Sequence, residues 1–151
     1  MQFDNFFSID APIGDVYATI ADVARVVPCV PGAELLEQQG DDVFEVALKA
    51  ELGPLWKNFL GTITVVERDP GAHRLVLTNS AREADGDPVG DATIEIGLAE
   101  LGSHTNVSIT TQTSLDEGMF AEKLVTDVAE KQMAQFAENL QAMIAAVPRA
   151  A

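Results

Sequence analysis

The sequence predicts an α+β fold in which a curved antiparallel sheet of about seven strands wraps around a long C-terminal helix and encloses an apolar cavity. Three observations support this prediction. An alternating segment at 2–9 precedes two short helical segments that end at Pro28. From 33 to 115 apolar residues recur at every second position, and from about 119 to 146 they recur at helical spacing. The connections between strands are too short for crossover helices, so neighbouring strands should be antiparallel.

The N-terminal elements follow from local signals. Residues 2–9 alternate between apolar and polar side chains, which is typical of a strand with one buried face. Pro12 lies where the first turn of a helix tolerates proline, and 13–20 repeats apolar residues at spacings of three and four. Asp22 can cap a second short helix that ends at Pro28.

The predicted strands have one apolar face and one polar face. The clearest case places Glu45, Lys49 and Glu51 opposite an apolar face that consists of Phe44, Val46, Leu48, Ala50 and Leu52. The alternation returns in later segments, which are separated by turn sequences such as 69–71 and 101–103. We therefore expect a meander whose polar face meets water.

The last helix carries a continuous apolar stripe. Its members are Val125, Ala129, Met133, Phe136, Leu140, Met143 and Val147. The apolar face of the sheet is the only predicted surface large enough to cover this stripe. A strongly curved sheet around one helix is often not filled by side chains alone, which predicts a cavity between them.

Composition narrows the functional classes. The 151 residues fit one domain at 1–147, with 148–151 as the start of a linker or tail. Nine basic against 24 acidic residues give a formal charge of -15, which disfavours nucleic acid and anionic lipids and favours a partner with a basic face. No signal peptide or spanning segment is evident, and the single Cys29 is consistent with the cytoplasm.

Residues suited to catalysis are few. His73 and His104 fall in or beside predicted turns and belong to no metal-ligand spacing. Cys29 lies between proline and valine, which favours an inert buried thiol. The acidic clusters, such as 41–42 and 85–87, lie in turns, where carboxylates meet solvent or cap the backbone. We therefore predict no catalytic residue, no metal and no enzymatic activity.

Several short motifs resemble one family. They are Cys29-Val30-Pro31-Gly32-Ala33-Glu34-Leu35, Ala11-Pro12, Leu52-Gly53-Pro54, Phe59-Gly61 and Phe136-Ala137-Glu138-Asn139-Leu140. With the order of elements, these motifs resemble the family of the G subunit of carbon monoxide dehydrogenase, within the START/Bet v 1-like (SRPBCC) helix-grip superfamily.

The resemblance implies a role. It implies a non-catalytic accessory protein that brings a molybdenum CO dehydrogenase to the cytoplasmic membrane and has a pocket for a hydrophobic ligand such as a quinone. Such proteins usually continue into a Pro/Ala-rich linker and a membrane-associating tail, whereas this sequence stops at 148–151. We therefore expect a cytoplasmic protein, peripheral to the inner face of the membrane, whose membrane contact uses a tail absent from this sequence.

The candidate ligand contacts come from the apolar faces of sheet and helix. The apolar candidates are Val30, Leu48, Leu52, Phe59, Leu77, Ile94, Ile96, Val125, Met133 and Phe136. Asn79, Thr111 and Thr113 alternate in phase with the inward apolar residues of their strands, so they can hydrogen-bond to a quinone carbonyl. Phe120 and Leu124 lie off the helix stripe and, with Trp56 in a loop after Gly53, can form an apolar lip. An alternative interpretation needs no ligand. The apolar candidates can be ordinary core residues, the threonines can be ordinary strand residues, and Asn79 can mark the end of a strand.

Three functional hypotheses follow. In the first, the domain carries menaquinone or ubiquinone between sheet and helix, with no covalent cofactor. In the second, the core is filled and the protein only recruits CO dehydrogenase to the membrane. The third is an enzyme acting on hydrophobic metabolites, for which a buried acid–base pair is needed, and the apolar faces show none.

Overall fold

The computed structural model describes residues 2–52, 55–84, 86, 88–114 and 122–146, without the side chains of 50–52, 55–57, 88–89, 122–129 and 146. Within these residues the strands form one antiparallel sheet of seven, in the order β1-β7-β6-β5-β4-β3-β2. The strands are β1 (Gln2–Ile9), β2 (Ala33–Gln39), β3 (Val43–Leu52), β4 (Leu55–Asp69), β5 (Arg74–Glu83), β6 (Pro88–Leu101) and β7 (His104–Thr113). Sequential strands from β2 to β7 are neighbours, so the predicted meander is confirmed.

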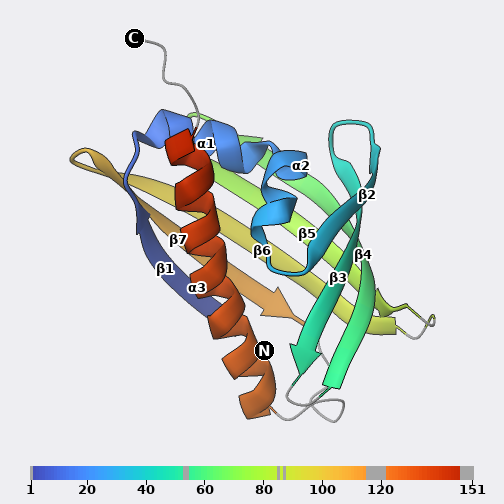
Figure 1. The fold of residues 1–151 in the computed structure, drawn as a ribbon. Coiled ribbons are helices and arrows are strands. Elements are labelled where there is room, and N and C mark those ends of the chain that lie inside the picture. The colour runs from blue at the N-terminus through green and yellow to red at the C-terminus, as the bar shows by residue number, and fades with distance from the viewer. Residues whose placement is uncertain (1, 53–54, 85, 87, 115–121, 147–151) are drawn as a thin grey trace.

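The helices lie on the concave side of the sheet (Figure 1). They are α1 (Ile13–Ala21), α2 (Val23–Val26), the short 3-10 helix η1 (Val27–Cys29) and α3 (Glu122–Ala146). The long helix α3 crosses this side next to β1, while α1 and α2 lie at one end, between α3 and the curled strands β2 to β4 (Figure 1). The α+β helix-grip architecture predicted from the sequence is therefore confirmed.

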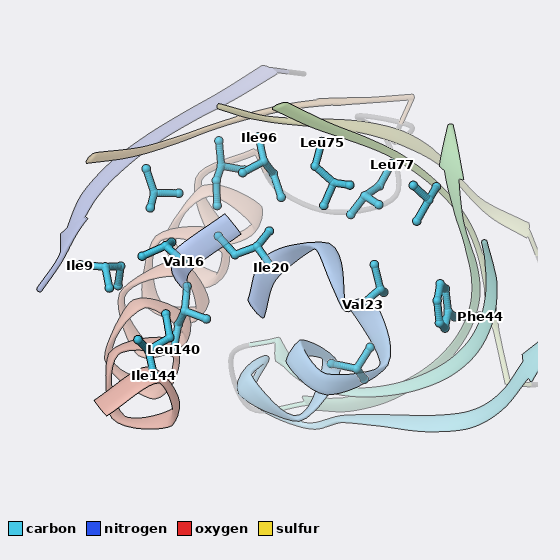
Figure 2. Packing of buried hydrophobic residues seen from close by; sticks show 14 of the residues in the cluster. Ile9, Val16, Ile20, Val23, Phe44, Leu75, Leu77, Ile96, Leu140 and Ile144 are labelled. Carbon is cyan, nitrogen blue, oxygen red and sulfur yellow. The ribbon is translucent and has the colours of Figure 1, made fainter. Parts of the chain in front are cut away.

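The hydrophobic core lies between the sheet, α1 and α3 (Figure 2). Val16 and Ile20 of α1 are buried between Leu75 and Ile96 of the sheet and Leu140 of α3. The remaining buried apolar members of this core are Ile9, Ala11, Val23, Val27, Phe44, Val46, Val65, Leu77, Val107, Ile109 and Ile144. The rings of Phe7 and Phe136 meet edge to face at 6.3 Å, which joins β1 to α3.

Packing fixes the segment that links the helices to the sheet. Gly32 has φ +80°, and a Cβ there would lie 2.3 Å from the carbonyl oxygen of Lys49 on β3. The amide of Lys49 donates to the Gly32 carbonyl at 3.0 Å. On the other side, Nδ2 of Asn139 on α3 donates to the Cys29 carbonyl at 2.8 Å. Glycine is therefore required here by both backbone conformation and close approach.

Three local predictions are corrected by the structure. The second α-helix ends at Val26 and continues as η1, because Pro28 supplies no amide for an α-helical bond. Asp22 precedes α2, but its side chain makes no capping bond, and its main-chain carbonyl accepts from the amides of Arg25 and Val26. Trp56, predicted in a loop, lies in β4, where it pairs with Glu51.

Candidate functional site

The inner face of the sheet has two ends of different character. At one end α1 is fastened to the sheet, because the hydroxyl of Thr105 donates to the Ala11 carbonyl at 2.8 Å and the hydroxyl of Tyr17 donates to the Arg74 carbonyl at 3.1 Å. Leu75 on β5 is buried at this end. This end is therefore closed by packing.

At the other end the inward side chains become small or polar. On β5, Leu75 and Leu77 are followed by the half-buried Asn79 and Ala81. On β7, the buried Val107 and Ile109 are followed by the half-buried Thr111 and Thr113, and on β6 Ile96 is followed by Ile94 and Ala92. We call the residues Gly61, Asn79, Ala81, Ala92, Thr111 and Thr113 the polar end of the inner face.

Asn79 lies at the centre of the polar end. It pairs with Ile63 on β4 and with Ala92 on β6, and Ala92 in turn pairs with Thr113 on β7. The Oδ1 atom of Asn79 is buried and has no hydrogen-bond partner among the residues that the structure describes. A buried acceptor without a partner costs roughly 1–3 kcal/mol, so a native structure needs a reason to keep one.

Gly61 provides the space for the Asn79 amide. A Cβ at position 61 would lie 2.8 Å from Oδ1 of Asn79, closer than real Cβ contacts. Glycine inside a strand weakens the strand and often marks a close approach by another group. Asn79 and Gly61 thus form a matched pair on adjacent strands.

Four of the predicted contact residues form one group. Leu77, Ile94 and Thr111 are neighbours in register across β5, β6 and β7, and Asn79 follows Leu77 on the same face. Leu77 is buried, whereas the other three are half-buried. Ile94 packs on the hydrophobic core. The group combines an apolar surface with an amide and a hydroxyl.

Two further candidates come from α3. Met133 and Phe136 are half-buried and pack against the core from the helix side. Ile96, in contrast, is 7% exposed and belongs to the closed core with α1.

Other candidates lie on the curled side of the sheet. Leu48 pairs with Phe59 between β3 and β4, and both are half-buried, as is Val30 just after η1. The register places Phe59 opposite Glu83 and two residues from Gly61. These three residues extend the candidate surface toward β3.

Several predictions fall on residues whose side chains are outside the described set. Leu52 ends β3, and Leu124 and Val125 are within α3, but only their backbone is described. Phe120 lies outside the described residues altogether. The apolar lip of Phe120, Leu124 and Trp56 therefore stays a prediction.

The residues considered for catalysis lie apart. His73 lies in a turn as predicted; we expected an exposed side chain there, but it is half-buried and its ring meets Tyr17 edge to face at 5.8 Å. His104 is exposed, with Nδ1 3.2 Å from a carboxylate oxygen of Asp10. Cys29 is buried, its Sγ lies 3.8 Å from Sδ of Met143, and burial raises the pKa of the thiol. The predicted burial of the thiol is confirmed, and a raised pKa fits a thiol of low reactivity.

Metal-binding and membrane-crossing features are absent from the described part of the chain. Its His, Cys, Asp and Glu side chains form no group of three or more that is placed to hold a metal ion. Among the same residues, no helix combines the length and apolarity that crossing a membrane requires.

Sequence reasoning missed the small residues of the polar end. Gly61, Ala81 and Ala92 carry no chemistry, so the sequence alone does not mark them as site residues. Their signal is the loss of large apolar side chains at inward positions, which is visible only when the strand registers are known.

Comparisons with solved structures support the fold. The chain is similar to a conserved protein from Geobacillus kaustophilus, with TM-score 0.83 and 17% identity over 96% of this chain and 95% of that one. The Zhui aromatase/cyclase from Streptomyces sp. R1128 gives TM-score 0.69 and 15% identity, with 96% and 93% covered. A START superfamily protein from Mycobacterium smegmatis gives TM-score 0.64 and 12% identity over 95% of this chain and 97% of that one. Such low identities establish the fold alone.

The sequence itself identifies the family. No curated protein sequence matches the chain. The family model of CoxG, the G subunit of carbon monoxide dehydrogenase, however, matches residues 6–145, which is nearly the whole chain. Membership implies association with a CO dehydrogenase system. From its motifs, its fold and this match, the chain belongs to the CoxG family of carbon monoxide dehydrogenase.

Proposed function

We propose that the protein is a non-catalytic accessory subunit of a molybdenum CO dehydrogenase system that carries a quinone, such as menaquinone, between its sheet and α3. In this role it links the enzyme to the membrane and the respiratory chain. Family membership supports the enzyme as partner. The quinone and the membrane link are proposals that rest on the site.

The observation that carries the proposal is the unpaired Oδ1 of Asn79. Oδ1 is an acceptor and can accept from the hydroxyl of the reduced quinol, whereas the Nδ2 amide of the same side chain can donate to a quinone carbonyl. The same side chain therefore serves both redox states of one ligand. Thr111, two strands away on the same face, offers a hydroxyl as a second polar group.

Apolar side chains from sheet and helix suit the remainder of such a ligand. Leu77 and Ile94 lie next to Asn79 and Ala92 along their strands, and Met133 and Phe136 pack on the hydrophobic core from α3. Ligand sites of this kind are mostly apolar, with few placed polar groups that fix the orientation. An isoprenoid tail contributes about 0.8 kcal/mol for each buried methylene, so this surface supplies most of the affinity.

The proposal is tested by titrating purified protein with a water-soluble menaquinone analogue and following bound ligand after gel filtration. Wild type should bind one equivalent. Asn79→Leu should bind roughly fivefold more weakly, because one hydrogen bond contributes about 1 kcal/mol. Val66→Ser, at an exposed position of β4, serves as the control and should bind as wild type does.

Met133→Trp separates ligand transfer from recruitment. The larger ring should fill the space beside the sheet and prevent quinone binding. Under the proposal, the variant still binds CO dehydrogenase but no longer supports electron transfer to the quinone pool. Unchanged electron transfer would contradict the carrier function and leave recruitment as the role of the domain.

A further inference from the structure

The outer face of the sheet carries a groove that the quinone site does not use. It has a volume of about 410 Å³ and crosses β1, β7 and β6. Phe6 stands at its edge with 78% of its surface exposed, the most exposed of the large apolar side chains that the structure describes. Its outward-facing lining is otherwise small or polar, from Ser8, Gly97, Ala99, Asn106 and Ser108. We call this surface the Phe6 groove.

The fold itself does not require a glycine at position 97. It lies inside β6, paired with Arg74 and Ser108, and the register is regular around it. Its φ is not positive, and a Cβ would meet only the hydroxyl oxygen of Ser108, at 3.3 Å. A larger residue would therefore fit with a small shift of one hydroxyl. Glycine within a regular strand often marks a place where another chain approaches closely.

The charges beside the groove are mainly negative. Asp4 lies two residues before Phe6 and accepts a hydrogen bond from Thr110 at 3.0 Å, which holds its carboxylate on the outer face. Glu95 precedes Gly97 by two residues, and Arg74 is engaged by both Glu95 and Glu67. With the formal charge of -15, this surface complements a basic partner and repels anionic lipid.

We propose that the Phe6 groove binds a basic segment of the CO dehydrogenase, in which an arginine or lysine stacks on Phe6 while its backbone passes over Gly97. A cation over an aromatic face beside carboxylates gains from both contacts, and the aliphatic part of the side chain covers apolar surface. The partner's identity rests on the proposed function. The groove is independent of Asn79, since it lies on the opposite face of the sheet.

Binding of CO dehydrogenase holoenzyme to the immobilised full chain tests the assignment. Phe6→Ser removes the aromatic face and Gly97→Val fills the floor, and each should raise Kd roughly tenfold or more. Val66→Ser, exposed but outside the groove, should bind as wild type does. Melting curves show whether each variant is folded, and Phe6→Ser is expected to remain folded because its side chain is exposed.

The outcomes are distinct. The proposed binding of the enzyme at the Phe6 groove is supported if added salt weakens holoenzyme binding and both groove variants lose it. If wild type and both folded variants bind the holoenzyme equally, the Phe6 groove is not the binding surface, and the proposed function is unaffected. If wild type does not bind the holoenzyme, both the proposed function and the partner assignment fail. If the variants lose binding to phosphatidylcholine vesicles but keep the enzyme, the groove is a membrane contact and the assignment is wrong.

Discussion

Two asparagines show how differently the same side chain is used at the scale of single residues. Asn139 on α3 donates from its amide to the Cys29 carbonyl at 2.8 Å and accepts from Gln135 at 3.0 Å. Asn79 has a buried Oδ1 for which the described part of the chain offers no hydrogen-bond partner. The first is a structural contact, and the second is the strongest candidate for ligand recognition.

This contrast predicts opposite effects on stability. Asn79→Leu should leave the free energy of unfolding unchanged or raise it by about 1 kcal/mol, because a near-isosteric apolar group replaces an unpaired acceptor. Asn139→Leu should lower it by roughly 1–2 kcal/mol, because the Cys29 carbonyl loses its donor. Urea denaturation of the two variants without ligand checks the pair. A loss of stability in Asn79→Leu as large as in Asn139→Leu would show that Asn79 is a structural residue.

The buried thiol gives a prediction about pH. Burial raises the pKa of Cys29 in the folded state, so above the roughly 8.5 of an exposed thiol the unfolded state loses its proton first. The contribution of Cys29 to stability is therefore complete below that pH and is lost as pH rises toward the folded pKa. Denaturation of wild type and Cys29→Ala between about pH 7 and 10 should show a steeper decline for wild type. Parallel declines would mean that the thiol is not shielded.

At the scale of elements, the link between η1 and β2 depends on Gly32. Gly32 and Gly40 both have positive φ, but only at Gly32 would a Cβ meet backbone, at 2.3 Å from the Lys49 carbonyl oxygen. Gly40→Ala should cost about 1 kcal/mol from conformation alone. Gly32→Ala should cost roughly 3 kcal/mol or more, because β3 must also move. Equal melting temperatures for the two variants would contradict the close approach.

Much of the element order was predictable, because each element has a strong local signal. The alternation in 43–48 correctly identified Phe44 and Val46 as inward and buried. The helix stripe was incomplete, since Ile144 is 3% exposed but was not assigned to it. Because a helix has 3.6 residues per turn, adjacent positions such as Met143 and Ile144 can both lie near the buried face. Contacts of α3 with α1 and β1 decide which of them is covered.

The candidate site was less predictable than its elements. The alternation of apolar and polar residues correctly placed Asn79 and Thr111 on the inner face, yet it could not show that the Asn79 amide lies against Gly61 of the next strand. Cross-strand neighbours depend on register and on bulges, such as the one between Val65 and Glu67, which the sequence pattern does not fix. The groove at Gly97 could not be predicted for the same reason.

At the scale of the whole molecule, the net charge of -15 should oppose compaction. Raising NaCl from about 50 mM to about 500 mM screens the repulsion, so the melting temperature should rise. Thermal unfolding followed by circular dichroism at both salt concentrations tests this expectation. A lower melting temperature at high salt would show that attractive charge pairs, such as Arg74 with Glu67 and Glu95, dominate instead.

The central claim is that the domain holds a quinone against Asn79 between its sheet and α3. Native mass spectrometry of the full chain, purified from a quinone-producing host, tests it most directly when followed by solvent extraction and identification of the released molecule. The account predicts a stoichiometric quinone in wild type and its depletion in Asn79→Leu. A protein that is empty after purification and takes up no added quinone would contradict it.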